Sequence, residues 1–220
     1  MYTLTIGDKA YSSWSMRGWL LLAGFGIKFE EEVVEMYTPA FDAMQAAHAP
    51  ARQVPQIAWR EGGRAHRLWD SLAIAETLAE RHPAAGHWPR DWALRMQARV
   101  LAAEMHSGLS ALRGACPMNL HRHMRPLAAP PEGLARDLER LGDLWDWAMR
   151  EGGGPWLAGP AFSAADVFYA PVASRLVSYA LTDDRTRGYA QMLMEQEAVA
   201  RWCREARAAP RRIARYDELA

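Results

Sequence analysis

The hydrophobic pattern of this chain changes character once, near residue 83, and this change restricts the possible folds more than any other feature. Before it, short apolar and β-branched runs alternate with helical stretches. After "PAAGHWPRDW", residues 83–92, the apolar residues keep helical spacing. Alternating strands and helices predict an α/β layer, whereas amphipathic helices alone pack on one another. We therefore predict an α/β domain over residues 1–82 and an all-α domain over residues 88–220.

The first 82 residues contain signals for four strands and three helices in the order βαβαββα. The strand signals are β-branched and apolar runs closed by turn residues, and the helix signals are capping residues ahead of an apolar run. The predicted strands cover residues 2–6, 29–36, 56–60 and 66–69, and the predicted helices cover 15–23, 40–47 and 71–81.

Two apolar stripes in the second half predict long amphipathic helices that pack against each other. The first stripe consists of Leu94, Ala98, Leu101, Met105, Gly108 and Leu112, and the second of Leu134, Leu138, Leu141 and Trp145. Further along, Ser163 and Asp166 have the S-x-x-D spacing of a helix N-terminus. A serine there accepts a free amide, and the helix dipole favours the acidic residue, so we interpret this pair as structural.

Composition excludes several classes of function. Lys+Arg and Asp+Glu number 26 each, so no net field attracts nucleic acid or an anionic membrane. No apolar stretch is long enough to span a bilayer, and the N-terminus lacks the pattern of a leader. Cys116 and Cys203 are too few for a disulfide framework, and His121 and His123 lack further metal ligands nearby. We predict a cytoplasmic protein without a metal that binds a small, neutral or zwitterionic ligand.

The stretch "YSSWS", residues 11–15, follows the first predicted strand and opens the first predicted helix. Ser15 suits the N-cap position, and Ser12 and Ser13 then are ordinary turn residues. A hydroxyl at such a turn also suits an anion at the helix N-terminus, where free amides and the dipole favour negative charge. Both interpretations stay open from this stretch alone.

Two residue pairs at the ends of predicted strands have a structural and a functional interpretation each. Pro55 precedes a strand, and the bond after Val54 is of the X-Pro type that adopts the cis form most readily. A cis bond would present the Val54 backbone to an extended peptide, whereas a trans proline would only start the strand. Asp70 and Ser71 form an ordinary helix cap, or they hold the ammonium and carboxylate of an α-amino acid group.

A polar face follows the first apolar stripe of the second half. His106, Ser110 and Arg113 stand at positions i, i+4 and i+7, so a continuous helix would align them. This face is either solvated or forms the wall of a cleft between the two domains.

In this order, the segments resemble the cytosolic glutathione transferases over essentially the whole chain. The resemblance rests on "SSWSMRGWLLLAGFGIKFE", "RQVPQI", "DSLAIAETL" and "FSAADVFYAPV", and the serine motif with the first helix is most similar to the zeta class. It implies a thioredoxin-like α/β domain followed by an all-helical domain, glutathione as co-substrate, and a homodimer. It also implies an enzyme that conjugates the glutathione thiolate to small hydrophobic electrophiles, as in detoxification.

The resemblance assigns roles within a glutathione site. Ser12 or Ser13 would be the catalytic hydroxyl that donates a hydrogen bond to the glutathione sulfur. Gln53 and Val54 would pair with the cysteinyl backbone of glutathione. The γ-glutamyl end would be bound by Asp70 and Ser71.

Other residues receive supporting roles. Pro55 would be the cis proline, Ser15 the helix cap and Arg17 a buried cation of the first helix. The electrophile pocket would be lined by His106, Ser110 and Arg113.

The sequence departs from the zeta pattern at one position and leaves alternatives open. Trp14 stands where the zeta motif has cysteine, which puts the isomerase activity of that class, of the maleylacetoacetate type, in doubt. Tyr11 is a second candidate for the hydroxyl. Glutathione-dependent isomerisation and a non-catalytic binding protein of the same fold remain the alternatives to transfer.

Overall fold

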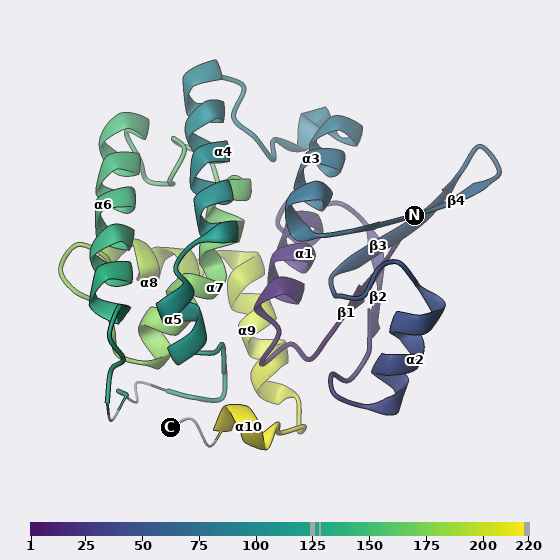
Figure 1. Cartoon of the computed structure of the whole chain (residues 1–220). Coiled ribbons are helices and arrows are strands. Elements are labelled where there is room, and N and C mark those ends of the chain that lie inside the picture. Colours follow the sequence, from purple (N-terminus) through teal and green to yellow (C-terminus); the bar gives the residue numbers. More distant parts are fainter. Residues whose placement is uncertain (124–125, 128, 218–220) are drawn as a thin grey trace.

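The computed structural model describes residues 1–123, 126–127 and 129–217. Its first part is a four-stranded mixed sheet of order β2-β1-β3-β4, in which β1 is parallel to β2 and antiparallel to β3 (Figure 1). The strands are β1 (Tyr2–Ile6), β2 (Phe29–Val33), β3 (Gln56–Glu61) and β4 (Arg64–Trp69). β2 is shorter than the predicted strand 29–36, because the Met36 amide bonds to the Asp8 carboxylate and Tyr37 turns the chain with a positive φ of 62°.

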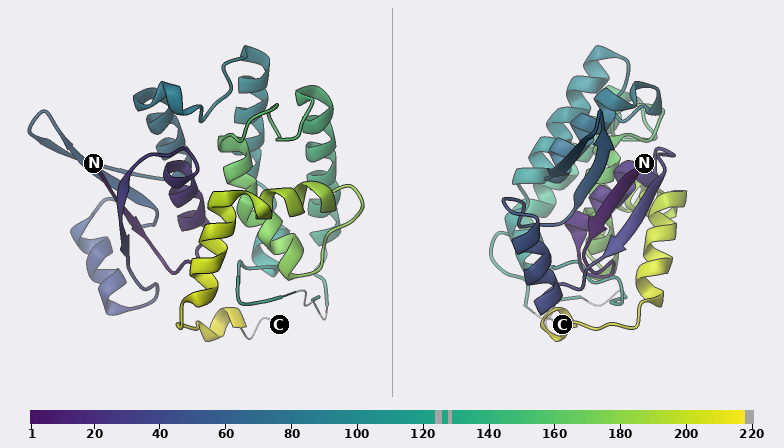
Figure 2. Two further views of the ribbon diagram at one scale, coloured as in Figure 1. Left: turned by 180° about the vertical axis from the view of Figure 1, so that it is seen from behind. Right: turned by 90° about the vertical axis from the view of Figure 1, so that its right-hand side faces the viewer.

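Helices α1 (Ser13–Ala23) and α3 (Ser71–Arg81) lie between the sheet and the second half of the chain, whereas α2 (Pro39–Ala47) lies on the other side of the sheet (Figures 1 and 2). Gly18 brings α1 directly onto the turn before β3. A Cβ at this position would lie 2.4 Å from the Pro55 Cβ, so a side chain there would push α1 away from the turn.

The second half of the chain is helical in the described residues. After the short 3₁₀ turn Pro83–Ala85 come α4 (Trp92–Ser107), α5 (Ser110–Ala115), α6 (Leu134–Gly152), α7 (Ala164–Ser178), α8 (Arg187–Glu195), α9 (Glu197–Ala208) and α10 (Ala214–Asp217). Helix α7 is the central one, because nearly all of its residues are buried and it packs against α1, α4 and α8.

One contiguous hydrophobic core joins the sheet layer to the helices, with Trp19 of α1 packed against Trp202 of α9. The predicted fold class is confirmed: a thioredoxin-like sheet with its helices is followed by a helical C-terminal region. The domain limits 1–82 and 88–220 stay a prediction.

Two local expectations are wrong. Helix α1 begins two residues earlier than predicted, and its N-cap is Ser12, whose side chain accepts a hydrogen bond from the Ser15 amide. Ser15 instead lies inside the first turn, fully buried. The continuous helix expected through Leu112 is also broken: α4 ends at Ser107, Gly108 is extended, and Leu109 has a positive φ of 54°. The i, i+4, i+7 argument for His106, Ser110 and Arg113 therefore fails.

Candidate functional site

Three chain segments meet at one end of the sheet. Because β1 and β3 are antiparallel, the end of β1 at Ile6 lies beside the start of β3, where Thr5 pairs with Gln56. Gln56 also pairs with Trp69 at the end of β4. The loop to α1, the turn before β3 and the start of α3 therefore share one edge, where ligands bind in open α/β sheets.

A cavity of about 430 Å³ opens at this edge, between the sheet layer and the helices. Its walls come from the start of α1, the segment after β2, the turn before β3, the α5 region, α7 and α10. The residues that line it include Tyr11, Ser12, Ser13, Trp14, Tyr37, Arg52, Gln53, Val54, Arg113, Arg175 and Tyr216. Among the described lining residues there are three arginines and no carboxylate.

The two candidate serines occupy different environments at the start of α1. Ser12 is buried, and its hydroxyl donates to Ser15 Oγ at 2.7 Å, which in turn accepts from the Gly7 amide at 2.9 Å. Ser13 is half-buried, and its Oγ accepts from Arg175 Nη2 at 3.4 Å. Both residues line the cavity, beside the free amides of the helix N-terminus.

Tyr11 lines the same cavity, but its hydroxyl is already engaged. It donates to Asp217 at 3.2 Å and accepts from the Ile213 amide at 3.3 Å. Burial raises the pKa of this phenol, so it loses its proton less readily than a free tyrosine. The Tyr11 hydroxyl is therefore poorly placed to donate a hydrogen bond to a thiolate.

The turn before β3 contributes backbone to the cavity wall. The Val54–Pro55 peptide bond is cis, and Gln53 and Val54 line the cavity. Gln56 fixes this turn from within, because its buried amide donates to the Gln53 carbonyl at 2.8 Å.

Asp70 and Ser71, the third predicted part of the site, lie at the start of α3 and are not among the described residues that line the cavity. Asp70 caps the helix by accepting from the Leu72 amide at 2.8 Å, in a backbone conformation with φ of 71° that side-chain residues rarely adopt. Such strain is typical of functional sites. Ser71 Oγ is fully buried and has no hydrogen-bond partner among the described residues. Buried hydroxyls are normally satisfied, so this one is suited to a bound ligand.

Arg17 carries a buried charge next to the site. The residue is 2% exposed, and its guanidinium stacks on the Trp14 ring at 3.8 Å from the ring centroid. Its Nε has no hydrogen-bond partner among the described residues. Burial lowers the pKa of Arg17 to about 9, and neighbouring Arg113 and Arg175 act in the same direction. An anion bound nearby would offset this accumulated positive charge.

Of the three residues expected in the electrophile pocket, Arg113 alone is among the described residues that line the cavity. The His106 ring packs against Trp14 in a T-shaped arrangement, and its Nε2 lies 3.4 Å from an Asp70 carboxylate oxygen, which connects α4 to the start of α3. Ser110 is exposed at the start of α5 and does not line the cavity. The prediction that Ser110 lines the electrophile pocket is therefore wrong, because the break at Gly108 removes its helical alignment with His106.

Arg175, Tyr37 and Tyr216 line the cavity although no sequence signal singles them out. Arg175 lies inside α7, Tyr37 in the turn after β2, and Tyr216 in α10, so only the tertiary fold brings them together. The Ser163–Asp166 pair lies at the start of α7 and forms a capping box.

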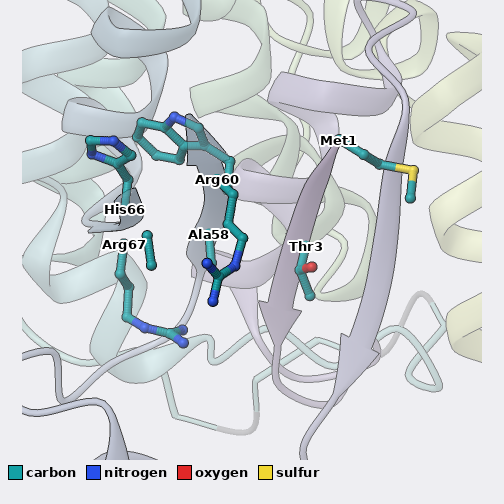
Figure 3. Close-up of a pocket in the computed structure, with 8 residues that line it drawn as sticks. Met1, Thr3, Ala58, Arg60, His66 and Arg67 are labelled. Atoms are coloured by element: carbon teal, nitrogen blue, oxygen red, sulfur yellow. The ribbon is translucent and has the colours of Figure 1, made fainter. Parts of the chain in front are cut away.

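A second hollow, of about 470 Å³, lies on the sheet between β1, β3 and β4. Figure 3 shows Thr3, Ala58, Arg60 and Arg67 along it, together with His66. None of the residues expected in the site lines this hollow, so the cavity beside Ser12 is the candidate site. Within the described residues, no three histidine, cysteine or acidic side chains converge as metal ligands. None of the described helices is long and apolar enough to cross a membrane.

Comparison with known proteins yields one family match. Residues 11–81 match the family described as glutathione S-transferase, N-terminal domain. This segment contains the three parts of the site around Ser12, Val54 and Asp70. No curated protein matches the chain.

Several solved structures share the fold over nearly the whole chain. A glutathione transferase homologue from Burkholderia gl BGR1 with bound glutathione is 23% identical, covers 94% of this chain and 99% of its own, and has a TM-score of 0.69. Glutathione transferase Omega 1C from Trametes versicolor is 20% identical, with 99% and 97% covered and a TM-score of 0.73. Maleylacetoacetate isomerase from Anaeromyxobacter dehalogenans 2CP-1, with dicarboxyethyl glutathione and citrate in its active site, is 28% identical, with 100% and 94% covered and a TM-score of 0.56.

Proposed function

We propose that this chain is a glutathione transferase that binds glutathione along the edge formed by Ser12, Val54 and Ser71. The observation that carries the proposal is the buried hydroxyl of Ser71 at the start of α3, which has no hydrogen-bond partner in the described part of the chain. It would donate to the γ-glutamyl carboxylate, helped by the helix amides, while Asp70 would accept from the ammonium group. Val54 would pair with the cysteinyl backbone through its own amide and carbonyl, with Gln53 beside it.

The sulfur end would lie at the start of α1, with Ser12 as its hydrogen-bond donor. A thiol with a pKa of about 8.5 is only a few per cent thiolate at neutral pH. Lowering that pKa by about two units requires about 2.7 kcal/mol of preferential stabilisation of the anion. A charge-assisted hydrogen bond contributes about 1.5 to 3 kcal/mol, and the helix dipole adds to it.

Ser12 is better prepared for this role than Ser13. Its oxygen is held in place by the Ser15 amide and hydroxyl. Because hydroxyl protons rotate, Ser15 can donate to Ser12 when Ser12 turns its own proton to the sulfur. Such a fixed donor stabilises a developing anion with little reorganisation. Ser13, beside Arg175, would add a second, weaker contact.

Replacing Ser71 with alanine is expected to weaken glutathione binding by about tenfold, because one hydrogen bond to a charged group is lost. Titration calorimetry would measure the affinity of glutathione and of cysteinylglycine, which lacks the γ-glutamyl group. Only glutathione should lose affinity in Ser71→Ala. Ser107→Ala, at an exposed serine that bonds within α4, is the matched control. Equal losses for both ligands, or none, would remove Ser71 from the γ-glutamyl site.

The electrophile would bind beyond the sulfur, and the residues there favour two substrate classes. The aromatic rings of Trp14 and Tyr216 suit a small hydrophobic electrophile, as in transfer to an aryl halide. Arg52, Arg113 and Arg175, with no acidic residue among the described lining residues, favour a carboxylate-bearing substrate instead. This second candidate is a glutathione-dependent isomerase of the maleylacetoacetate type, and the isomerase from Anaeromyxobacter supports it.

Turnover separates these candidates from a binding protein. An enzyme of the first class would turn over a generic aryl halide with glutathione, and one of the second class a maleyl double bond. Glutathione binding without either activity would identify a non-catalytic protein of this fold. A cytoplasmic location and a role in detoxification belong to the same proposal, and the free, buried Cys116 and Cys203 are consistent with a reducing compartment.

A homodimer is also part of the proposal, and an exposed apolar stripe on α4 supports it. Trp92, Met96 and Val100 are 68%, 47% and 45% exposed and lie on one helix face, four residues apart. Such a stripe is typical of an interface with a second copy. Light scattering at micromolar concentration should give twice the mass of one chain, and Met96→Glu should raise the dissociation constant about tenfold or more. A monomeric wild type would contradict the proposal.

A further inference from the structure

The C-terminal residues of the described chain cross the candidate site. Residues 211–217, called the C-terminal strap below, include α10, which lies at the same end of the molecule as the start of α1 (Figure 1). Tyr216 of the strap lines the cavity, and its ring stacks on Tyr11 with centroids 5.2 Å apart. Tyr11 immediately precedes Ser12, so the strap covers the sulfur end of the site proposed above.

Both ends of the strap are fastened to the rest of the protein. At its start, Arg211 pairs with the largely buried Asp8 at 2.5 Å and donates to the Met36 carbonyl at 2.8 Å. At its end, Asp217 accepts from Tyr11 at 3.2 Å and from the Asn119 side chain at 2.8 Å. Between them, the amide of the buried Ile213 donates to the Tyr11 hydroxyl at 3.3 Å, so the backbone of the strap is held along its length and an opening has to come from its side chains.

Near its end, the strap also reaches the opposite rim of the cavity through the side chain of Tyr216. The hydroxyls of Tyr37 and Tyr216 lie 2.8 Å apart at the protein surface, and both residues line the cavity. Tyr37 belongs to the turn between β2 and α2, so this bond links two walls that are far apart in sequence. Arg215 stacks on the Tyr37 ring at 4.7 Å from its centroid and supports the same contact.

We infer that the C-terminal strap is a cover for the electrophile end of the site, closed by the Tyr37–Tyr216 hydroxyl pair, and that it limits the size of the group carried by the glutathione sulfur. The inference rests on the proposed glutathione site. A large substituent on sulfur has to break the hydroxyl pair on its way in and out. Glutathione itself, with only a thiol at this end, does not.

Stopped-flow fluorescence tests the cover, because Trp14 lines the cavity and reports ligand binding. The probes are glutathione, S-methylglutathione and S-hexylglutathione, each mixed with wild type, Tyr37→Phe, Tyr216→Phe and the double variant. A hydrogen bond of about 1 kcal/mol corresponds to about a fivefold change in rate. We expect association and dissociation of S-hexylglutathione to accelerate about fivefold in each single variant, with less than about a twofold change for glutathione.

The double variant tests whether the two hydroxyls act through one shared hydrogen bond or independently of each other. If the hydroxyls act through one bond, removing both accelerates S-hexylglutathione no more than removing either one. Multiplied effects in the double variant would overturn the inference, as would unchanged S-hexylglutathione rates in both single variants. Tyr2→Phe, at the far end of β1, is the matched control and should leave all rates unchanged. If wild type bound none of the three probes, the proposed function would fail as well, which is a different result from equal rates.

Discussion

Ser12→Ala is expected to lower turnover of an aryl halide with glutathione about tenfold to a hundredfold. The variant removes one charge-assisted hydrogen bond to the thiolate, worth about 1.5 to 3 kcal/mol. The pKa of bound glutathione should rise by one to two units, since about 1.4 kcal/mol corresponds to one unit. Thiolate absorbance in a pH titration of the complex measures this shift. Glutathione affinity, which we propose depends mainly on Val54, Asp70 and Ser71, should change much less.

The same variant also removes a helix cap, and a control has to separate the two effects. Loss of an N-cap serine costs about 1 kcal/mol of stability. Asp91 caps α4 by accepting from the Leu94 amide at 2.9 Å, far from the cavity lining. Asp91→Ala should therefore lose a similar amount of stability and keep its turnover. A fall in turnover for both variants would attribute the Ser12 effect to stability rather than to the thiolate.

Ser13→Ala distinguishes the two serines. Its hydroxyl caps no helix and accepts only one long hydrogen bond, from Arg175, among the described contacts. We expect a loss of turnover of about threefold or less, consistent with a weak contact. If Ser13→Ala loses more turnover than Ser12→Ala, the donor is Ser13. If both variants keep wild-type turnover and thiol pKa, the serine mechanism is wrong.

Much of the sheet layer could be predicted from local signals. Helix α3 has the predicted bounds, because Asp70 caps it by accepting from the Leu72 amide and an apolar pattern follows without interruption. The strands β1, β3 and β4 start or end at turn residues, and Gly62 and Gly63, both with positive φ, form the hairpin turn between β3 and β4. In these segments the backbone conformation is decided within a few residues.

Local sequence signals mislead where two local structures are equally compatible with the same residues. Ser12, Ser13 and Ser15 are all acceptable caps, and the choice falls on Ser12 because the buried Ser15 hydroxyl is needed to accept from the Gly7 amide. The apolar stripe continues through Leu112, but Gly108 and the positive φ of Leu109 break the helix, and Leu112 is still buried from α5. Periodicity cannot distinguish one long helix from two that keep the same residue in the core.

The cavity lining is the least predictable part, because it depends on contacts between distant segments. Arg175 reaches the site from α7, where its Nε donates to the Cys116 carbonyl at 2.7 Å and its position is fixed by burial. The hydroxyls of Tyr37 and Tyr216 are in contact although the two residues are separated by 179 positions in the sequence. Isolated arginine and tyrosine residues carry no spacing signal, so only the tertiary structure identifies them.

Asp166→Asn is expected to produce the largest loss of stability, about 3 kcal/mol. The Asp166 carboxylate is fully buried and accepts from the amides of Leu157 and Ser163 and from the hydroxyls of Ser163 and Tyr189. An amide has only one acceptor oxygen, so its NH₂ group would face the donors of Ser163 and leave a buried amide unsatisfied. In a chain of this length the melting temperature should fall by about 6 to 12 °C.

A second variant and a binding measurement test whether the loss of stability comes from the Asp166 carboxylate. Tyr189→Phe removes one donor but leaves the carboxylate three partners, so it should cost only about 1 kcal/mol in urea unfolding. Below its unfolding midpoint, Asp166→Asn should bind glutathione as wild type does, because Asp166 does not line the cavity. A loss of affinity in the folded variant would show that the start of α7 controls the position of Arg175 and hence the site. Equal stability of Asp166→Asn and wild type would mean that the carboxylate is not needed to satisfy these four donors.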